Sequence, residues 1–223
     1  MEKKLLGQGL IKYVSGVILV GLMLFLPAGT LHFPNGWLFM GLLFLPMLGA
    51  GFVMYFKNPD LLRRRLNARE KEGEQKLVLA GSALMFLAAF VLAGLNFRFQ
   101  WTAMPRWLVI LGAAVFLLSY ALYAEVLREN AYLSRTVEVQ ENQKVIDTGL
   151  YGIVRHPMYA VTVWLFLSMA LVLGSLPSLI VMLIYPALLI RRILNEEKVL
   201  EEGLPGYREY EKKVKWRLIP FIW

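Results

Sequence analysis

Long runs without a single charged residue are the feature of this sequence that most constrains its fold. The first run fills the whole stretch between Lys12 and Lys57, and three more cover residues 77–97, 107–124 and 157–190. About 20 consecutive apolar residues are enough for a helix to cross the hydrocarbon core of a bilayer. The runs are continuous, whereas a transmembrane β-barrel needs alternating residues. The sequence therefore predicts an all-α integral membrane protein.

Turn residues inside these runs divide them into about six transmembrane helices. We expect these helices at residues 13–28, 37–56, 77–95 and 107–127, followed by two more within residues 157–190. The segment "GSLP" at 174–177 splits the last run into halves of roughly 16 residues, each about 24 Å long as a helix. We expect a C-terminal helical hairpin there, extended at its polar ends, and a re-entrant pair is the alternative.

Basic residues are distributed unevenly among the predicted loops. All Lys and Arg residues except Arg98 and Arg106 lie in the N-terminal segment, in the loops after the second and fourth helices, or in the C-terminal tail. Because positively charged loops remain in the cytoplasm, we expect a multi-pass protein with both termini cytoplasmic. The net charge of +8 then reflects orientation and contact with anionic membrane lipids, and no nucleic-acid partner is expected.

The cysteine and histidine counts exclude several kinds of site. The chain has no cysteine, which excludes disulfides, thiolate metal sites, iron–sulfur clusters and a cysteine nucleophile. It has only two histidines, so we expect no metal centre.

Two polar segments have patterns of their own. The segment "NPDLLRRRL" at 58–66 begins with a potential capping residue, Asn58, and mixes Leu with Arg, which is typical of a short helix at the lipid interface. In the segment "SRTVEVQENQKVIDTGLY" at 134–151, residues 136–139 favour an extended strand, and Val145 and Ile146 either pair with it or pack.

The predicted hairpin brings two polar segments together. An antiparallel pair places "YGIVRHPMY", at the start of its first helix, beside "RRILNEEKVLEE", at the end of its second helix. Arginine suits a carboxylate, glutamate suits an ammonium group or ribose hydroxyls, and aromatic faces suit a sulfonium or an adenine. A zwitterionic cofactor such as S-adenosylmethionine fits this mixed cluster. Proline at a helix start and arginines that extend to lipid phosphates are the structural alternative.

These same residues resemble a known enzyme family. "TGLYGIVRHPMY", followed by "RILNEEKVLEEGLPGYREYEKKVKWRLIP", is similar to the isoprenylcysteine carboxyl methyltransferases, in a wider group that includes phospholipid N-methyltransferases. The resemblance implies a membrane-embedded, S-adenosylmethionine-dependent methyltransferase with a cytoplasmic active site. It implies that the cofactor site is lined by Tyr151, Arg155, His156, Tyr159 and Glu196, and that Arg192 and Glu197 are the catalytic residues near the reacting methyl group.

The resemblance also gives a domain organisation and a substrate class. We expect one membrane domain over residues 1–223, with N-terminal transmembrane helices at 1–127 and a catalytic, cofactor-binding region at 128–223. The acceptor would be a lipophilic molecule that enters from the bilayer. A carboxylate acceptor, the favoured case, would be oriented by Arg192, whereas an amine acceptor would need Glu197 as its base.

Two other classes of function remain open from the sequence. A reductase of the sterol-reductase type would use NADPH and would be expected to surround its phosphates with more arginines and fewer glutamates. A non-catalytic membrane protein could keep the same fold without binding either cofactor.

Overall fold

The computed structural model describes residues 2–66, 73–133 and 137–223, and the regular structure in these ranges is entirely helical. The elements are α1 (Glu2–Ala28), α2 (Pro34–Lys57), α3 (Pro59–Leu66), α4 (Gly73–Phe99), α5 (Arg106–Glu129), a 3-10 turn η1 (Gly149–Gly152), α6 (Pro157–Val172), α7 (Leu176–Met182), α8 (Tyr185–Gly203) and α9 (Tyr207–Lys213). The prediction of an all-α membrane protein is confirmed.

Five segments of the described chain are long and apolar enough to cross a membrane. They are α1, α2, α4, α5 and the combined α7–α8 segment Leu176–Gly203. The sixth apolar segment, α6, has only 16 residues and would span about 24 Å. The last uncharged run therefore forms the predicted hairpin. Its second arm is itself interrupted at Leu183 and Ile184, between α7 and α8.

Two glycines mark the places where the helices pack most closely. Helix α4 packs along α1, and α5 packs along α6. A Cβ atom added at Gly94 of α4 would lie 2.5 Å from the carbonyl oxygen of Leu24 in α1. One added at Gly112 of α5 would lie 2.6 Å from the Cβ of Leu171 in α6. Small residues of this kind allow helix backbones to approach one another in a bilayer.

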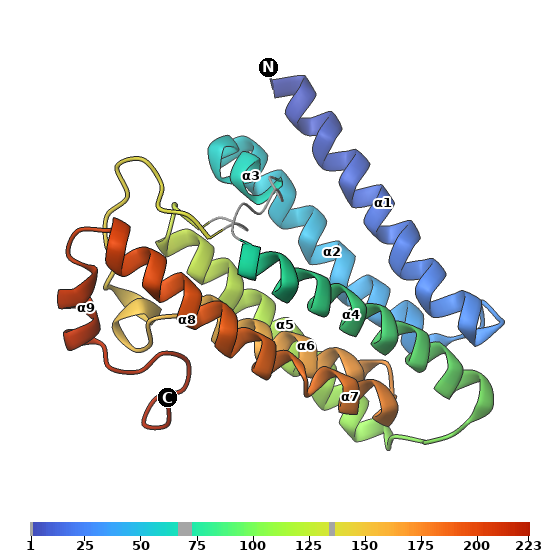
Figure 1. Ribbon diagram of the computed structural model, residues 1–223. Helices are drawn as coiled ribbons and strands as arrows, with labels where there is room; N and C mark the ends of the chain where they lie inside the picture. Colours follow the sequence, from blue (N-terminus) through green and yellow to red (C-terminus); the bar gives the residue numbers. More distant parts are fainter. Residues whose placement is uncertain (1, 67–72, 134–136) are drawn as a thin grey trace.

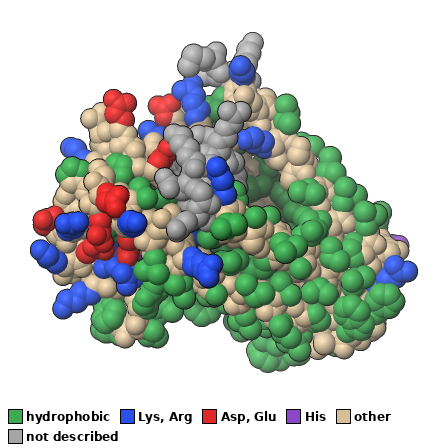
Figure 2. All heavy atoms as spheres, viewed as in Figure 1, with side chains coloured by type: hydrophobic (Ala, Val, Ile, Leu, Met, Phe, Trp, Pro, Cys, Tyr) green, Lys and Arg blue, Asp and Glu red, His purple; other side chains and the backbone are tan. Residues whose placement is uncertain are grey.

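The two ends of the helix bundle differ in composition. Figure 1 shows the connections α1–α2, α4–α5 and α6–α7 at one end, and α3, the end of α8, and α9 toward the other. In Figure 2, acidic and basic side chains gather over the α8–α9 end, whereas hydrophobic side chains cover most of the remaining face. Large exposed apolar residues such as Phe56 and Ile110 are suited to contact with lipid.

The two polar segments have different outcomes. The predicted helix after Asn58 is confirmed as α3, and the Asn58 side chain accepts a hydrogen bond from the Leu61 backbone N–H at 3.1 Å. The predicted strand is wrong for residues 137–139, which are irregular, and Thr136 lies outside the described residues. Val139 and Val145 pack against a hydrophobic cluster formed by the end of α8 and by α9, which is the packing alternative for Val145.

Candidate active site

The hairpin brings the start of α6 beside the end of α8, as expected. Helix α6 begins at Pro157, which is favoured at a first helical position, and His156 is its N-cap residue. Arg155 and His156 thus lie at the mouth of the hairpin and face α8. Both are buried, with 8% and 5% of their surfaces exposed.

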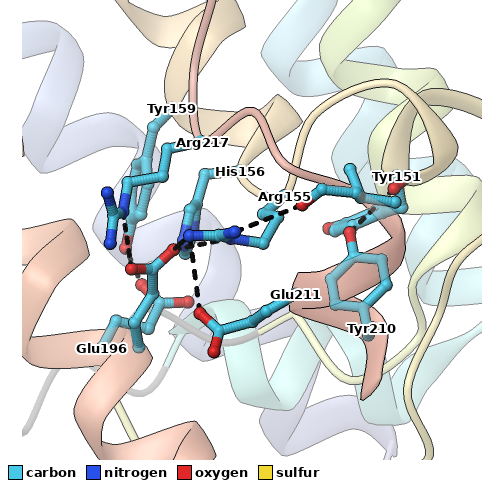
Figure 3. A network of polar contacts seen from close by, with 10 residues as sticks. Tyr151, Arg155, His156, Tyr159, Glu196, Tyr210, Glu211 and Arg217 are labelled. Atoms are coloured by element: carbon cyan, nitrogen blue, oxygen red, sulfur yellow. Dashed lines mark hydrogen bonds and ion pairs between the residues drawn. The ribbon is translucent and has the colours of Figure 1, made fainter. Parts of the chain in front are cut away.

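Three basic side chains that Figure 3 labels, those of Arg155, His156 and Arg217, converge on the buried carboxylate of Glu197 at this mouth. Glu197 accepts hydrogen bonds from Arg155 Nε at 2.8 Å and from Arg217 Nε at 2.7 Å. His156 Nε2 lies 3.2 Å from the same carboxylate. Glu197 is only 3% exposed. Two guanidinium groups in contact with a carboxylate favour its charged form, so Glu197 is a poor acceptor for a further proton.

The polypeptide after α9 completes this network, and sequence reasoning missed its contribution. The backbone N–H of Arg155 donates to the Trp216 carbonyl at 2.8 Å, and that of His156 donates to the Arg217 carbonyl at 2.9 Å. Arg217 is therefore fixed by its backbone and by Glu197. The resemblance extended over this segment, which was the only sequence signal that pointed to it.

A cavity with an accessible volume of about 90 Å³ opens at the hairpin mouth. All five residues predicted to bind the cofactor line it, together with Arg192: they are Tyr151, Arg155, His156, Tyr159, Glu196 and Arg192. Glu197 does not line the cavity. Its carboxylate contacts Arg155 and His156, which do.

Tyr159 links the two sides of the mouth within the cavity. Its hydroxyl donates to the carboxylate of Glu196 on α8 and accepts from Arg192 Nε at 2.8 Å. The guanidinium carbon of Arg192 lies 5.8 Å from the centre of the Tyr159 ring. An arginine, a tyrosine and a glutamate from two helices thus form one polar chain that faces the cavity.

The outer wall of the cavity is built outside the apolar helices. Leu204, Tyr207, Tyr210 and Val214 form a small hydrophobic cluster there with Val139, Val145 and Leu200. The Tyr210 hydroxyl donates to the Tyr151 carbonyl at 2.7 Å, and Asn130 Nδ2 donates to the Tyr151 hydroxyl at 3.0 Å. Burial raises the pKa of both tyrosines above its ordinary value, so both remain protonated.

Two further ion pairs lie near the cavity. Arg155 Nη2 lies 3.4 Å from Glu211 Oε1, and partial burial raises the pKa of Glu211 (Figure 3). At the surface, Lys213 Nζ lies 2.6 Å from Asp147 Oδ2, and this hydrogen bond lowers the pKa of Asp147. The Lys213–Asp147 pair ties α9 to the segment before η1. Glu211, like Arg217, was not predicted from the sequence.

Comparison with known protein families gives a match to part of the chain. Residues 107–205 match the family model of the phospholipid methyltransferases. The search of curated proteins found no match to the chain. The matched region begins in α5 and includes the whole hairpin with Arg155, His156 and Glu197, whereas α9 and Arg217 lie outside it. It supports a membrane methyltransferase and leaves the kind of acceptor atom undecided.

Proposed function

We propose that this protein transfers a methyl group from S-adenosylmethionine to a lipophilic acceptor that reaches the cavity from the bilayer. The observation that carries the proposal is the cavity itself, where Arg155, His156, Tyr159, Arg192 and Glu196 meet at the mouth of a membrane hairpin. The match of residues 107–205 to phospholipid methyltransferases supports the same chemistry independently.

The side chains of the cavity fit the charges of this methyl donor. Arginine side chains suit a carboxylate, and Glu196 suits an ammonium group or sugar hydroxyls. The faces of Tyr151 and Tyr159 suit adenine or a positively charged sulfonium. Tyr207 also lines the cavity, and its buried hydroxyl has no hydrogen-bond partner among the described residues. We propose Tyr151, Arg155, His156, Tyr159 and Glu196 as the donor-binding residues.

The reaction would be an in-line displacement that needs no covalent enzyme intermediate. When bound, the donor supplies an electrophilic methyl carbon on a sulfonium sulfur. Attack by the acceptor atom forms a bond to that carbon while the carbon–sulfur bond breaks, and both electrons of the broken bond stay on sulfur. The protein would mainly position the two reactants and exclude water.

The structure gives Arg192 and Glu197 different proposed roles. Arg192 lines the cavity, and we propose that it orients the acceptor. Glu197 was predicted from the sequence as catalytic and, for an amine acceptor, as the base. Its carboxylate is occupied by Arg155, His156 and Arg217. We therefore propose Glu197 as a positioning residue that holds the charged wall of the cavity.

Carboxylate O-methylation is the favoured reaction. A carboxylate acceptor is ionised at neutral pH, so the reaction needs no base. This agrees with the site, because the Glu197 carboxylate is already paired with three basic side chains and is not placed to act as a base. Its negative charge suits Arg192. Phospholipid or other amine N-methylation is the second candidate, because the matching family is that of phospholipid methyltransferases.

The pH dependence of the reaction separates these two acceptors. An amine acceptor must lose a proton before attack, so its rate should fall as the pH drops below neutrality. A carboxylate acceptor should keep its rate over the same interval. We would follow transfer of a labelled methyl group from S-adenosylmethionine to membrane lipid extracts between pH 5 and 8, and identify the product by mass spectrometry.

Binding of two nucleotide ligands tests the proposal against its rivals. The purified protein in detergent should be stabilised against heat by S-adenosylhomocysteine and not by NADPH. Stabilisation by NADPH alone would support a reductase instead. If neither ligand binds, the protein is not the proposed methyltransferase, and a non-catalytic role becomes the better explanation.

A further inference from the structure

Five tyrosines line the cavity, and one of them has an unusual environment. They are Tyr132, Tyr151, Tyr159, Tyr207 and Tyr210. Four of the hydroxyls have hydrogen-bond partners, including the Asn142 carbonyl for Tyr132 and the Tyr151 carbonyl for Tyr210. The Tyr207 hydroxyl has no partner among the described residues, although Tyr207 is only 4% exposed. An unpaired buried hydroxyl reduces stability, and native structures seldom keep one without a reason.

The ring of Tyr207 is held firmly while its hydroxyl is not. Tyr207 is the first residue of α9, which follows Gly206 in a left-handed conformation (φ 85°). Its ring packs in the cluster with Leu204 and Val214, and its centre lies 5.8 Å from that of Tyr210. Packing alone would be served equally well by phenylalanine. The hydroxyl therefore calls for a separate explanation.

The charges around Tyr207 define what the hydroxyl can bind. Burial, together with the nearby carboxylates of Glu197 and Glu196, raises the pKa of Tyr207 well above its ordinary value. The hydroxyl therefore keeps its proton and can donate a hydrogen bond. Arg155 also lies near Tyr207 and acts on its pKa in the opposite direction. A neutral group that accepts from Tyr207 and also donates to a carboxylate suits these surroundings.

We propose that Tyr207 binds a sugar hydroxyl of the methyl donor. This inference rests on the proposed function. A ribose hydroxyl can accept from Tyr207 and donate to Glu196, which lines the same cavity. The Tyr207 oxygen is shielded from water, so binding includes a small adjustment of α9, a helix of seven residues at the edge of the fold.

Replacement of Tyr207 by phenylalanine should have two opposite effects. Tyr207→Phe keeps the packed ring and removes the unpaired hydroxyl, so the ligand-free protein should melt about 2 °C higher. The same variant should bind S-adenosylhomocysteine about tenfold more weakly, because the donated hydrogen bond is lost. Both values can be measured on the full chain in detergent, by thermal unfolding and by isothermal titration calorimetry.

Tyr210→Phe is the matched control on the same helix. It removes a hydroxyl that already has a partner, so the ligand-free protein should melt at a lower temperature than the wild type. If Tyr207→Phe raises the melting temperature and leaves the affinity for S-adenosylhomocysteine unchanged, the inference is wrong. If the wild type does not bind S-adenosylhomocysteine, the proposed function fails and the inference fails with it.

Deoxyribose analogues test the assignment to the sugar. The 2′-deoxy and 3′-deoxy forms of S-adenosylhomocysteine each lack one hydroxyl. For the form that lacks the hydroxyl bound by Tyr207, the wild type should lose more affinity than Tyr207→Phe does, because the variant has already lost one of the two hydrogen bonds of that hydroxyl. Fully additive losses for both analogues would overturn the assignment, because additivity means that the two groups do not interact.

Discussion

Glu196 and Glu197 are neighbours in the sequence, but their carboxylates have different surroundings. Glu197 is buried between Arg155 and Arg217, whereas Glu196 lines the cavity and accepts from Tyr159. Removing one partner of a buried ion pair leaves the other charge uncompensated, which is strongly destabilising. We expect Glu197→Gln to lower the free energy of unfolding by about 2 kcal/mol or more. Thermal unfolding of the purified protein without ligand would measure this.

Glu196→Gln is the matched substitution one position earlier. It should change the unfolding free energy by less than about 0.5 kcal/mol, because Glu196 is only partly buried and glutamine can still accept from Tyr159. It should instead weaken binding of S-adenosylhomocysteine. Equal destabilisation by the two substitutions would contradict the separation into a positioning residue and a cavity residue.

Arg192 and Arg191 offer a similar comparison for the reaction itself. Arg192 lines the cavity and donates to Tyr159, whereas Arg191 is exposed. If Arg192 orients the acceptor, Arg192→Ala should reduce kcat about 100-fold while S-adenosylhomocysteine still binds. Arg191→Ala should leave kcat close to the wild-type value. A methyl-transfer assay with saturating donor would measure both, and an active Arg192→Ala variant would rule out the proposed role.

Sequence reasoning could predict which residues meet at the hairpin mouth but not how they pair. Topology alone predicts that an antiparallel hairpin brings Arg155 and Tyr159 close to Arg192. Consecutive residues of a helix point about 100° apart, so the sequence could not show which glutamate faces the cavity. Arg217 was missed because its place depends on two backbone hydrogen bonds, which leave no pattern in the side chains.

At the scale of elements, the packing of α1 against α4 depends on one glycine. A side chain at Gly94 would meet the Leu24 carbonyl oxygen at 2.5 Å and the Ala28 backbone nitrogen at 2.9 Å. These are backbone atoms, so the helices themselves would have to move apart. We expect Gly94→Ala to lower the unfolding free energy by about 2 kcal/mol, measured by thermal unfolding in detergent.

Gly41 of α2 provides the control, since a Cβ atom there would meet no atom within 4 Å. Gly41→Ala should leave stability unchanged or raise it slightly, because alanine restricts the unfolded chain more than glycine does. A Gly94→Ala variant as stable as Gly41→Ala would show that the α1–α4 crossing is not tightly packed.

The long helices were predictable as elements, whereas the segment around residues 137–146 was not. Uncharged runs identify helices because every backbone polar group in a bilayer must be satisfied within its own segment. The β-branched residues Val137, Val139 and Val145 suggested a strand by local preference. Tertiary packing overrides that preference here: Val139 and Val145 pack against a cluster that includes Tyr207 and Tyr210, with no neighbouring strand to pair with in the described chain.

At the scale of the whole molecule, the distribution of basic residues and the arrangement of the helices indicate the same orientation in the membrane. The hairpin mouth, α3 and α9 lie toward one end of the bundle (Figure 1), and nearly all the described basic residues belong to this end. Among the described residues, only Arg98 and Arg106 belong to the opposite end. The positive-inside rule then predicts that the cavity and both termini face the cytoplasm. This orientation would place the methyl-transfer site where soluble S-adenosylmethionine is available.

Single cysteines can test this orientation directly, because the chain has none of its own. Glu202 is exposed near the end of α8, and Ala103 is exposed in the α4–α5 connection at the opposite end. In sealed cells, a membrane-impermeant maleimide should label Ala103→Cys and leave Glu202→Cys unlabelled. After the membrane is opened, both should react. Labelling of Glu202→Cys alone in sealed cells would reverse the orientation, and the cavity would then face away from the cytoplasmic pool of methyl donor.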